Sequence, residues 1–464
     1  MAGLTHSATD LRSPLEAVVG ADHVRDDAGA LLTFSTDATP LQRGAPDIVV
    51  FPGSAEEVAA VLRIADERRV PVVPRGSGTN LSAGTVPHRG GIVLVLTRMD
   101  RIREISPDDL VAVCEPGVRT IELAQAAAEQ KLLFPPDPGS HTTATIGGNV
   151  AECSGGLRAL KYGVTRDYVL GVEAVLATGE IIRSGGRLVK DVAGYDLRRL
   201  LCGSEGTLAV MTELTLRLMP APEESGTGMA YFADLADAAR AVSRVLSSGV
   251  LPVTLEFLDR VCIDAVEGYS QIGLDRTAGA LLIFGQDGDP GTIERDMRRM
   301  ADACEAEGAT DVRIAGTAEE AADVLQARRA VLPALSRLEP LTILEDATVP
   351  RSRIAEMVAR IQEIAERHDL LIGTFGHAGD GNLHPTVVLD AADEDAIHRA
   401  HEAFDEIFAH AIEMGGSITG EHGVGLVKLR HLESQLGADQ LALMRRIKAA
   451  FDPHGILNPG KLGS

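Results

Sequence analysis

Three segments rich in glycine, serine, threonine and asparagine lie far apart within the first 210 residues of the chain. They read PRGSGTNL at residues 74–81, PGSHTTATIGGNVAECSGG at residues 138–156 and GSEGTL at residues 203–208. Glycines let a backbone approach a ligand closely, and successive backbone N–H groups can bind an anion. Three such segments are more than turns usually require. Together they could wrap an extended dinucleotide with backbone N–H groups.

Short β-rich runs alternate with short helices around these segments, from Asp47 to about Pro220. Residues 54–69 begin with a capping box, Ser54 followed by Glu57, and continue with apolar residues at helical spacing. We therefore expect an α+β domain over residues 46–220, preceded by a helical segment at residues 1–45. The first glycine-rich segment is not a Rossmann fingerprint, because Leu81 occupies the place of the third glycine.

The composition changes at PAPEESGTG, residues 220–228, where turn-forming and acidic residues gather. Beyond it, amphipathic helix patterns alternate with apolar strand patterns. The helix patterns cover residues 235–249, 292–308 and 353–369, and the strand patterns cover residues 280–286 and 370–377. This alternation predicts a second, α/β domain over residues 225–415, a substrate or cap domain, followed by a C-terminal segment at residues 416–464.

Composition excludes several classes of protein. The formal charge of -23 argues against nucleic-acid binding, which requires clustered Lys and Arg. The chain shows no run of about 20 apolar residues and no secretory signal pattern, so we expect no transmembrane segment and a cytoplasmic location. Its five cysteines lie too far apart for a disulfide framework or an iron–sulfur motif.

The segment FGHAGDGNLHP, residues 375–385, places His377 and His384 seven residues apart around a glycine-rich turn. In one interpretation the histidines belong to a polar surface turn, since Gly, Asp and Asn are good turn formers. In the other, the turn folds back and directs both imidazoles at one cation, because histidine is the commonest metal ligand among side chains.

A second polar segment, GGSITGEHGVGLVK at residues 415–428, adds Glu421 and His422. His377, His384 and Glu421 form a set of two imidazoles and a carboxylate, which suits zinc, iron or manganese and leaves coordination positions open. A structural zinc site would normally close with four protein ligands. The open set therefore indicates a substrate-binding divalent metal. The histidines at 398, 401 and 410 fit the polar face of a surface helix instead.

The motifs together resemble a known family. PRGSGTNL, TIGGNVAECSGG, YGVTRDYVLG, KDVAGYDL and GSEGTL resemble the FAD-binding domain of the vanillyl-alcohol-oxidase/PCMH superfamily. FGHAGDGNLHP, GEHGVG and NPGK resemble its 2-hydroxy-acid dehydrogenase branch, most closely the glycolate oxidase subunits, with D-lactate and D-2-hydroxyglutarate dehydrogenases near them. The resemblance implies a two-part PCMH-type FAD-binding domain, a cap domain and a C-terminal segment that returns to the flavin.

The resemblance also implies which residues bind FAD. It assigns one group to the pyrophosphate, a second to the ribityl chain and ring, and a third to the adenine end, with the C-terminal asparagine touching the flavin. These are, in order, Pro74, Arg75, Gly76, Ser77, Gly78, Thr79 and Asn80; Pro138, Gly139, Ser140, Thr145, Gly148 and Asn149; Glu205, Gly206 and Val210; and Asn458. The phosphate loop has no histidine, so we expect non-covalent FAD.

The implied chemistry is the oxidation of a D-2-hydroxy acid, with zinc as the first choice of metal. His422 would be the general base, and Arg328 would bind the substrate carboxylate; Arg329 competes for that role, but on a helix the two point about 100° apart. The segment LEDATVP, residues 344–350, lacks the lysine of the 2-hydroxyglutarate relatives, which favours a monocarboxylate such as glycolate or D-lactate.

Electrons must leave the reduced flavin for an external acceptor. An iron–sulfur or electron-transfer protein, a quinone or O2 could take them, and a protein partner could hold the chain at a membrane surface. A homodimer is left open. The alternatives are a D-2-hydroxyglutarate or longer-chain 2-hydroxy-acid dehydrogenase, a flavin-binding subunit without chemistry of its own, and a zinc hydrolase, which the flavin motifs disfavour.

Overall fold

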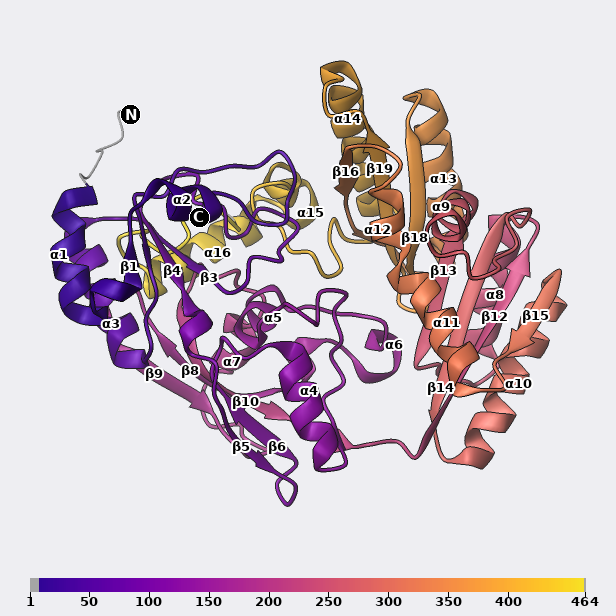
Figure 1. The fold of residues 1–464 in the computed structure, drawn as a ribbon, viewed down its shortest axis with the longest axis horizontal. Helices are drawn as coiled ribbons and strands as arrows, with labels where there is room; N and C mark the ends of the chain where they lie inside the picture. The colour runs from indigo at the N-terminus through magenta and orange to yellow at the C-terminus, as the bar shows by residue number, and fades with distance from the viewer. Residues whose placement is uncertain (1–7, 463–464) are drawn as a thin grey trace. The chain divides into compact units, whose positions relative to one another are not determined.

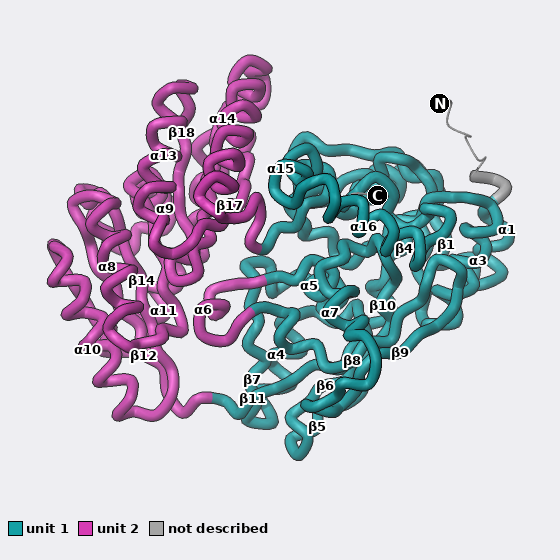
Figure 2. Tube along the Cα trace, turned by 180° about the vertical axis from the view of Figure 1, so that it is seen from behind, with its two compact units in different colours: residues 1–154, 164–221, 421–464 teal, residues 155–163, 222–420 magenta. Residues whose placement is uncertain are grey.

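The computed structural model describes residues 8–462, and the chain divides into two compact units (Figure 2). Unit 1 comprises the chain up to Ser154, Val164–Ala221 and the chain from Glu421 onward, and unit 2 comprises Gly155–Gly163 and Pro222–Gly420. The excursion Gly155–Gly163 was not anticipated from the sequence. It belongs to unit 2 because Lys161 Nζ donates to Gln286 Oε1 and to the Asp287 carbonyl, at 3.0 and 2.8 Å.

Unit 1 contains two larger sheets and one two-stranded sheet, with helices around them (Figure 1). Its strands are β1 Val24–Arg25, β2 Ile48–Val50, β3 Val72–Arg75, β4 Ile92–Val95, β5 Ile102–Ser106, β6 Val111–Cys114, β7 Leu132–Leu133, β8 Val169–Val175, β9 Ile181–Gly185, β10 Val210–Arg217 and β11 Met219–Pro220. Its α-helices are α1 Ala8–Val19, α2 Ala28–Thr33, α3 Ala55–Arg68, α4 Thr120–Glu129, α5 Ile146–Glu152, α7 Leu197–Leu201, α15 Leu432–Leu436 and α16 Ala438–Phe451.

The two larger sheets make unit 1 a two-part domain. The order β1-β2-β4-β3 has parallel pairs β2–β4 and β3–β4, whereas β5-β6-β10-β8-β9 is antiparallel throughout. Helix α3 begins as predicted, with Ser54 Oγ accepting from the Glu57 amide and the Glu57 carboxylate accepting from the Gly53 amide. The C-terminal chain joins the first sheet, since the Val72 amide donates to the Ile456 carbonyl.

Unit 2 is built on one antiparallel sheet, in the order β15-β12-β14-β13-β18-β19-β16, with β17 also paired to β19. Its strands are β12 Glu224–Phe232, β13 Thr254–Asp259, β14 Ala280–Gly288, β15 Asp311–Ile314, β16 Leu341–Leu344, β17 Ala347–Thr348, β18 Leu371–His377 and β19 Asn382–Leu389. Its α-helices are α6 Ala159–Tyr162, α8 Leu235–Ser247, α9 Arg260–Ser270, α10 Pro290–Ala306, α11 Ala318–Arg329, α12 Val331–Leu335, α13 Ile354–Arg367 and α14 Glu394–Glu413.

Helices cover both faces of this sheet. On one face, α9, α11 and α12 enclose a core that includes Leu258, Phe375 and Val388. On the other face, α8 packs with α10 and α13. The inner strands β13, β14, β18 and β19 are therefore buried on both faces, which explains why the predicted strand patterns at residues 280–286 and 370–377 read as continuous apolar runs. The expected α+β fold, with a two-part first domain and a second domain of sheet and helices, is confirmed.

Within residues 8–462, no helix combines the length and the apolar character needed to cross a bilayer.

Candidate active site

His377 and His384 lie in a β-hairpin, in which the strand predicted over residues 370–377 ends at His377 and a second strand carries His384. His377 ends β18, Asn382 begins β19, and these two residues face each other across the hairpin. Phe375 pairs with His384 in the same register. Because His377 follows Phe375 by two residues, both imidazoles project from one face of the sheet. Their ring centroids lie 5.2 Å apart, and both residues are buried.

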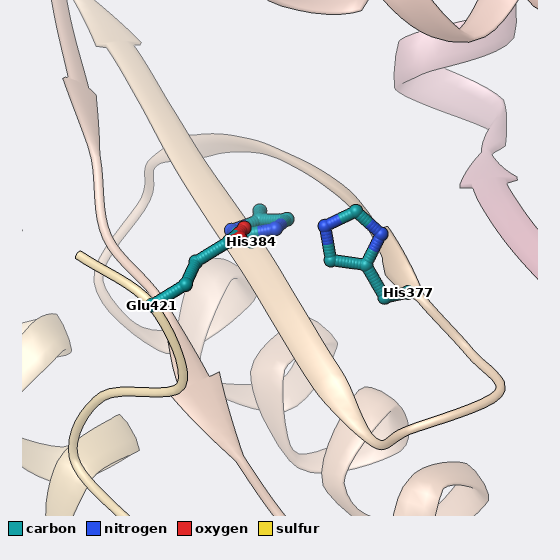
Figure 3. Close-up of side chains that lie close together, drawn as sticks. All are labelled: His377, His384 and Glu421. Atoms are coloured by element: carbon teal, nitrogen blue, oxygen red, sulfur yellow. The ribbon is translucent and has the colours of Figure 1, made fainter. Parts of the chain in front are cut away.

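Glu421 completes a cluster with the two histidines (Figure 3). One ligand atom from each of the three side chains lies within 4.8 Å of the other two. Glu421 directly follows Gly420, the last residue of unit 2, whose amide donates to Asp346 Oδ2 at 2.7 Å. Two imidazoles and one carboxylate are donors that suit zinc, manganese or iron and leave coordination positions open. The donor set therefore fits a divalent metal.

A buried carboxylate orients His377. Glu256, on β13, is 1% exposed, and its Oε1 lies 2.8 Å from His377 Nδ1. Its Oε2 accepts from Arg328 Nε at 2.7 Å. Arg328 lies in the last turn of α11 and is buried, while Arg329 is exposed. The guanidinium of Arg328 also lies over the Phe375 ring, 4.7 Å from its centroid.

The segment that carries His422 is anchored within unit 1. Ser82 Oγ donates to the His422 carbonyl at 2.6 Å. The two oxygens of Glu205 accept from the amides of Val424 and Gly425, at 2.7 and 2.8 Å. Glu205 therefore holds the chain just after His422. Both oxygens of the Glu205 carboxylate are engaged there. The contact of Glu205 with the adenine end, which the resemblance implied, stays a prediction.

Gly423 is required at its position for two reasons. Its φ of 82° lies in the left-handed region, and a Cβ there would approach Glu152 Oε2 to 2.3 Å. Glu152 is held by Asn80 Nδ2, which donates to Oε1 at 2.7 Å. Burial, with the neighbouring Glu205 carboxylate, raises the pKa of Glu152 well above its usual value. The GEHGVG segment thus packs against the carboxyl groups of Glu152 and Glu205.

The predicted phosphate loop leaves β3 at Pro74 and Arg75. The Arg75 guanidinium donates to the Thr36 carbonyl at 2.6 Å and lies over Phe34, so this side chain is engaged in packing. Gly78 has a φ of 76°, and a Cβ there would meet the Arg75 guanidinium. Within residues 8–462, the backbone amides of residues 77–80 donate no hydrogen bond to another part of the chain. These amides stay the predicted donors for an anionic group such as the pyrophosphate.

The other predicted flavin residues also lie in unit 1. Pro138, Gly139 and Ser140 form a turn, with the His141 amide donating to the Pro138 carbonyl. Thr145 caps α5 by accepting from the Gly148 amide, and Asn149 Nδ2 donates to Thr120 Oγ1 at 2.6 Å. Gly206 follows Glu205 with a positive φ, Val210 begins β10, and Asn458 Nδ2 donates to the carbonyls of Gly84 and Glu205.

Lys461 connects the C-terminal chain to residues 84–86, which follow the phosphate loop, by hydrogen bonds. It is fully buried, and its Nζ donates to Gly84 O, Val86 O and Asn458 Oδ1 at 2.8, 2.7 and 2.8 Å. Lys461→Met should therefore lower the free energy of unfolding by about 3 kcal/mol, because buried acceptors lose their donor at about 1–3 kcal/mol each. Urea unfolding measures this loss, and Lys190→Met, at an exposed position, is the control. Equal stability of the two variants would contradict the anchoring role.

Sequence reasoning missed Glu256, Ser82 and the anchoring role of Glu205. A signal for Glu256 did exist, since a carboxylate in the apolar run TLEFLD, residues 254–259, must be paired if the strand is buried. Its partner could not be read from the sequence, because His377 lies 121 residues away.

Two family models match two long segments of the chain. A model described as "FAD binding domain" matches residues 46–185, and one described as "FAD linked oxidases, C-terminal domain" matches residues 221–462. The chain is 50% identical over 453 residues to the glycolate oxidase subunit GlcD of Bacillus subtilis (strain 168), covering 98% of this chain and 96% of that protein. It is 40% identical over 418 residues to a D-lactate dehydrogenase of Archaeoglobus fulgidus, covering 89% and 91%.

A solved structure shares the fold. p-Cresol methylhydroxylase with substrate bound matches with a TM-score of 0.83 at 18% identity, covering 99% of this chain and 98% of that one. At this identity the likeness concerns the fold alone.

Proposed function

This chain belongs to the FAD-linked oxidases, as its motifs predicted, and we propose that it oxidises a small D-2-hydroxy acid, glycolate or D-lactate, to the 2-oxo acid. The observation that carries the proposal is the cluster of His377, His384 and Glu421. A 2-hydroxy acid presents a hydroxyl and a carboxylate, which can chelate one cation in a five-membered ring. The names of the relatives agree with this substrate class.

The flavin loops of unit 1 supply the binding groups for FAD. The amides of residues 77–80 would bind the pyrophosphate, and this is supported by the positive φ of Gly78, which allows a tight loop there. FAD, when bound, supplies the two-electron oxidant that accepts the hydrogen leaving the substrate's C2 as hydride. The remaining expected flavin contacts, from residues 138–149, 205–210 and 458, are part of the same proposal.

The cluster of His377, His384 and Glu421 would supply the metal ligands. A divalent cation held by His377, His384 and Glu421 would act as a Lewis acid that lowers the pKa of the substrate hydroxyl. Zinc is the first choice, and manganese or iron also suits these donors.

We propose that His422 accepts the proton of the substrate hydroxyl and that Arg328 binds the substrate carboxylate. We assign His422 as the general base because it follows a ligand residue and its backbone is fixed by Ser82. Arg328 donates a hydrogen bond from Nε to Glu256, so its two terminal Nη groups can bind a substrate carboxylate. The hydroxyl proton passes to the imidazole, and the C2 hydrogen leaves with the electron pair, so the products are a 2-oxo acid and reduced flavin.

Electrons then pass to an external acceptor, which we propose to be an electron-transfer protein or a quinone. A relative is named as a subunit, which agrees with a protein partner. The same name raises a second candidate, a flavin-binding subunit that catalyses nothing alone. The two candidates differ in whether the purified chain reduces its own flavin.

The purified protein is expected to contain about one FAD per chain, released intact by acid or heat because the phosphate loop has no histidine for covalent attachment. Anaerobic addition of glycolate or D-lactate should bleach the flavin absorbance, with L-lactate and D-2-hydroxyglutarate as comparison substrates. Bleaching only by D-2-hydroxyglutarate would replace the monocarboxylate proposal by a dicarboxylate one. A flavin that no 2-hydroxy acid bleaches would favour the non-catalytic subunit.

A further inference from the structure

Glu256 connects two groups with different proposed tasks. Phe257 pairs with Gly376 across β13 and β18, so Glu256 lies level with His377 on the neighbouring strand. One carboxylate oxygen contacts the His377 imidazole, and the other contacts the Arg328 guanidinium. All three side chains are buried within unit 2. The sheet and helix α11 therefore place one carboxylate between a proposed metal ligand and the proposed substrate arginine.

The hydrogen bonds determine the tautomer of His377. An ionised carboxylate only accepts hydrogen bonds, and arginine only donates them. Nδ1 of His377 must therefore carry the proton that Glu256 accepts, which puts the ring's basic lone pair on Nε2, the nitrogen that would coordinate a cation. A carboxylate that accepts from the second nitrogen of a metal-binding histidine also raises the basicity of the ligand nitrogen.

We propose that Glu256 is a positioning residue that holds His377 in the Nδ1–H tautomer and fixes Arg328 beside it. The inference rests on the proposed function, because Glu256 has this positioning role only if His377 binds a metal and Arg328 binds the substrate. Through this one side chain, the metal ligand and the carboxylate-binding group would be set in a fixed relative position.

Glu256→Gln tests the tautomer directly. Arg328 Nε–H still requires an acceptor, so the amide oxygen of the introduced side chain should turn toward the arginine and its NH2 group toward His377. That arrangement favours the Nε2–H tautomer, whose ligand nitrogen is blocked. Zinc affinity, measured by competition with a chromophoric chelator, should fall by about 10- to 100-fold. The side-chain ¹⁵N shifts of His377 in the metal-free protein should change from the Nδ1–H pattern to the Nε2–H pattern.

Arg328→Met is the decisive comparison, because it also breaks the buried ion pair but leaves Glu256 as acceptor for His377. Its zinc affinity should stay within about threefold of the wild type, whereas a purely structural role of the ion pair predicts equal losses in both variants. In the double variant Glu256→Gln/Arg328→Met, the amide can turn its oxygen to His377, so zinc affinity should recover relative to Glu256→Gln alone.

Glu115→Gln is the matched control, since Glu115 is equally buried and paired with arginines but contacts no histidine in the described chain. Its zinc affinity should equal that of the wild type. Glu256→Gln with unchanged zinc affinity, or Arg328→Met with an equal loss, would overturn the inference. If the wild type itself binds no zinc, manganese or iron, the metal part of the proposed function fails, while the ¹⁵N shifts still decide the role of Glu256.

Discussion

Replacement of His422 by asparagine is expected to slow anaerobic flavin reduction by a good 2-hydroxy acid by a factor of about 10² to 10⁴, the usual contribution of a general base. FAD and metal should both be retained, because the side chain is proposed as base and not as ligand. The backbone contact from Ser82 Oγ to the residue 422 carbonyl does not depend on the imidazole, so the segment should keep its conformation. Stopped-flow absorbance gives the reduction rate, and metal analysis gives the occupancy.

Glu421→Gln is the paired variant that distinguishes the proposed ligand role of Glu421 from the proposed base role of His422. Its metal occupancy should fall, and added zinc or manganese should restore part of the activity. The opposite pattern, with metal lost in His422→Asn and kept in Glu421→Gln, would exchange the two roles. Flavin reduction at the wild-type rate in His422→Asn would place the base elsewhere.

His384→Ala is expected to abolish metal binding at stoichiometric concentrations and to lower turnover by roughly 10³-fold, since several kcal/mol of Lewis-acid stabilisation would be lost. FAD should remain bound, because His384 belongs to unit 2 and the proposed flavin-binding residues belong to unit 1. Metal analysis, flavin absorbance and steady-state turnover measure the three effects.

His398→Ala is the control for this variant. His398 lies on α14 with its side chain 73% exposed, beside Glu402, and it should affect neither metal nor turnover. Loss of FAD together with the metal in His384→Ala would mean that the two binding sites depend on each other for folding. Full metal content and turnover would remove the histidine pair from the chemistry.

The elements that local patterns define were largely predictable. The capping box at Ser54 and Glu57 placed α3, and the amphipathic patterns placed α8, α10 and α13. These signals are local, because a cap or an apolar stripe involves residues within a few turns of the same helix. Residue types likewise indicated a metal set from His377, His384 and Glu421, and the same three residues form the cluster in the structure.

The side-chain directions of the two histidines were not predictable. Residues seven apart in one extended strand face opposite sides, since side chains alternate with a period of two. The register of the β18–β19 hairpin, with Phe375 opposite His384, brings both imidazoles to one face instead. A one-residue change in that register would have separated them.

By itself, the sequence determined the family, the two domain types and the residue types of the site, because glycine loops, helix patterns and paired imidazoles are local features. Only the tertiary structure decided which groups meet. It placed Glu256 beside His377 through the β13–β18 pairing, and it buried Arg328 against Glu256 while Arg329 is exposed. It also brought the Glu205 carboxylate to the Val424 amide, in the loop after His422. The order of strands in a sheet follows from packing of the whole unit, which no local pattern encodes.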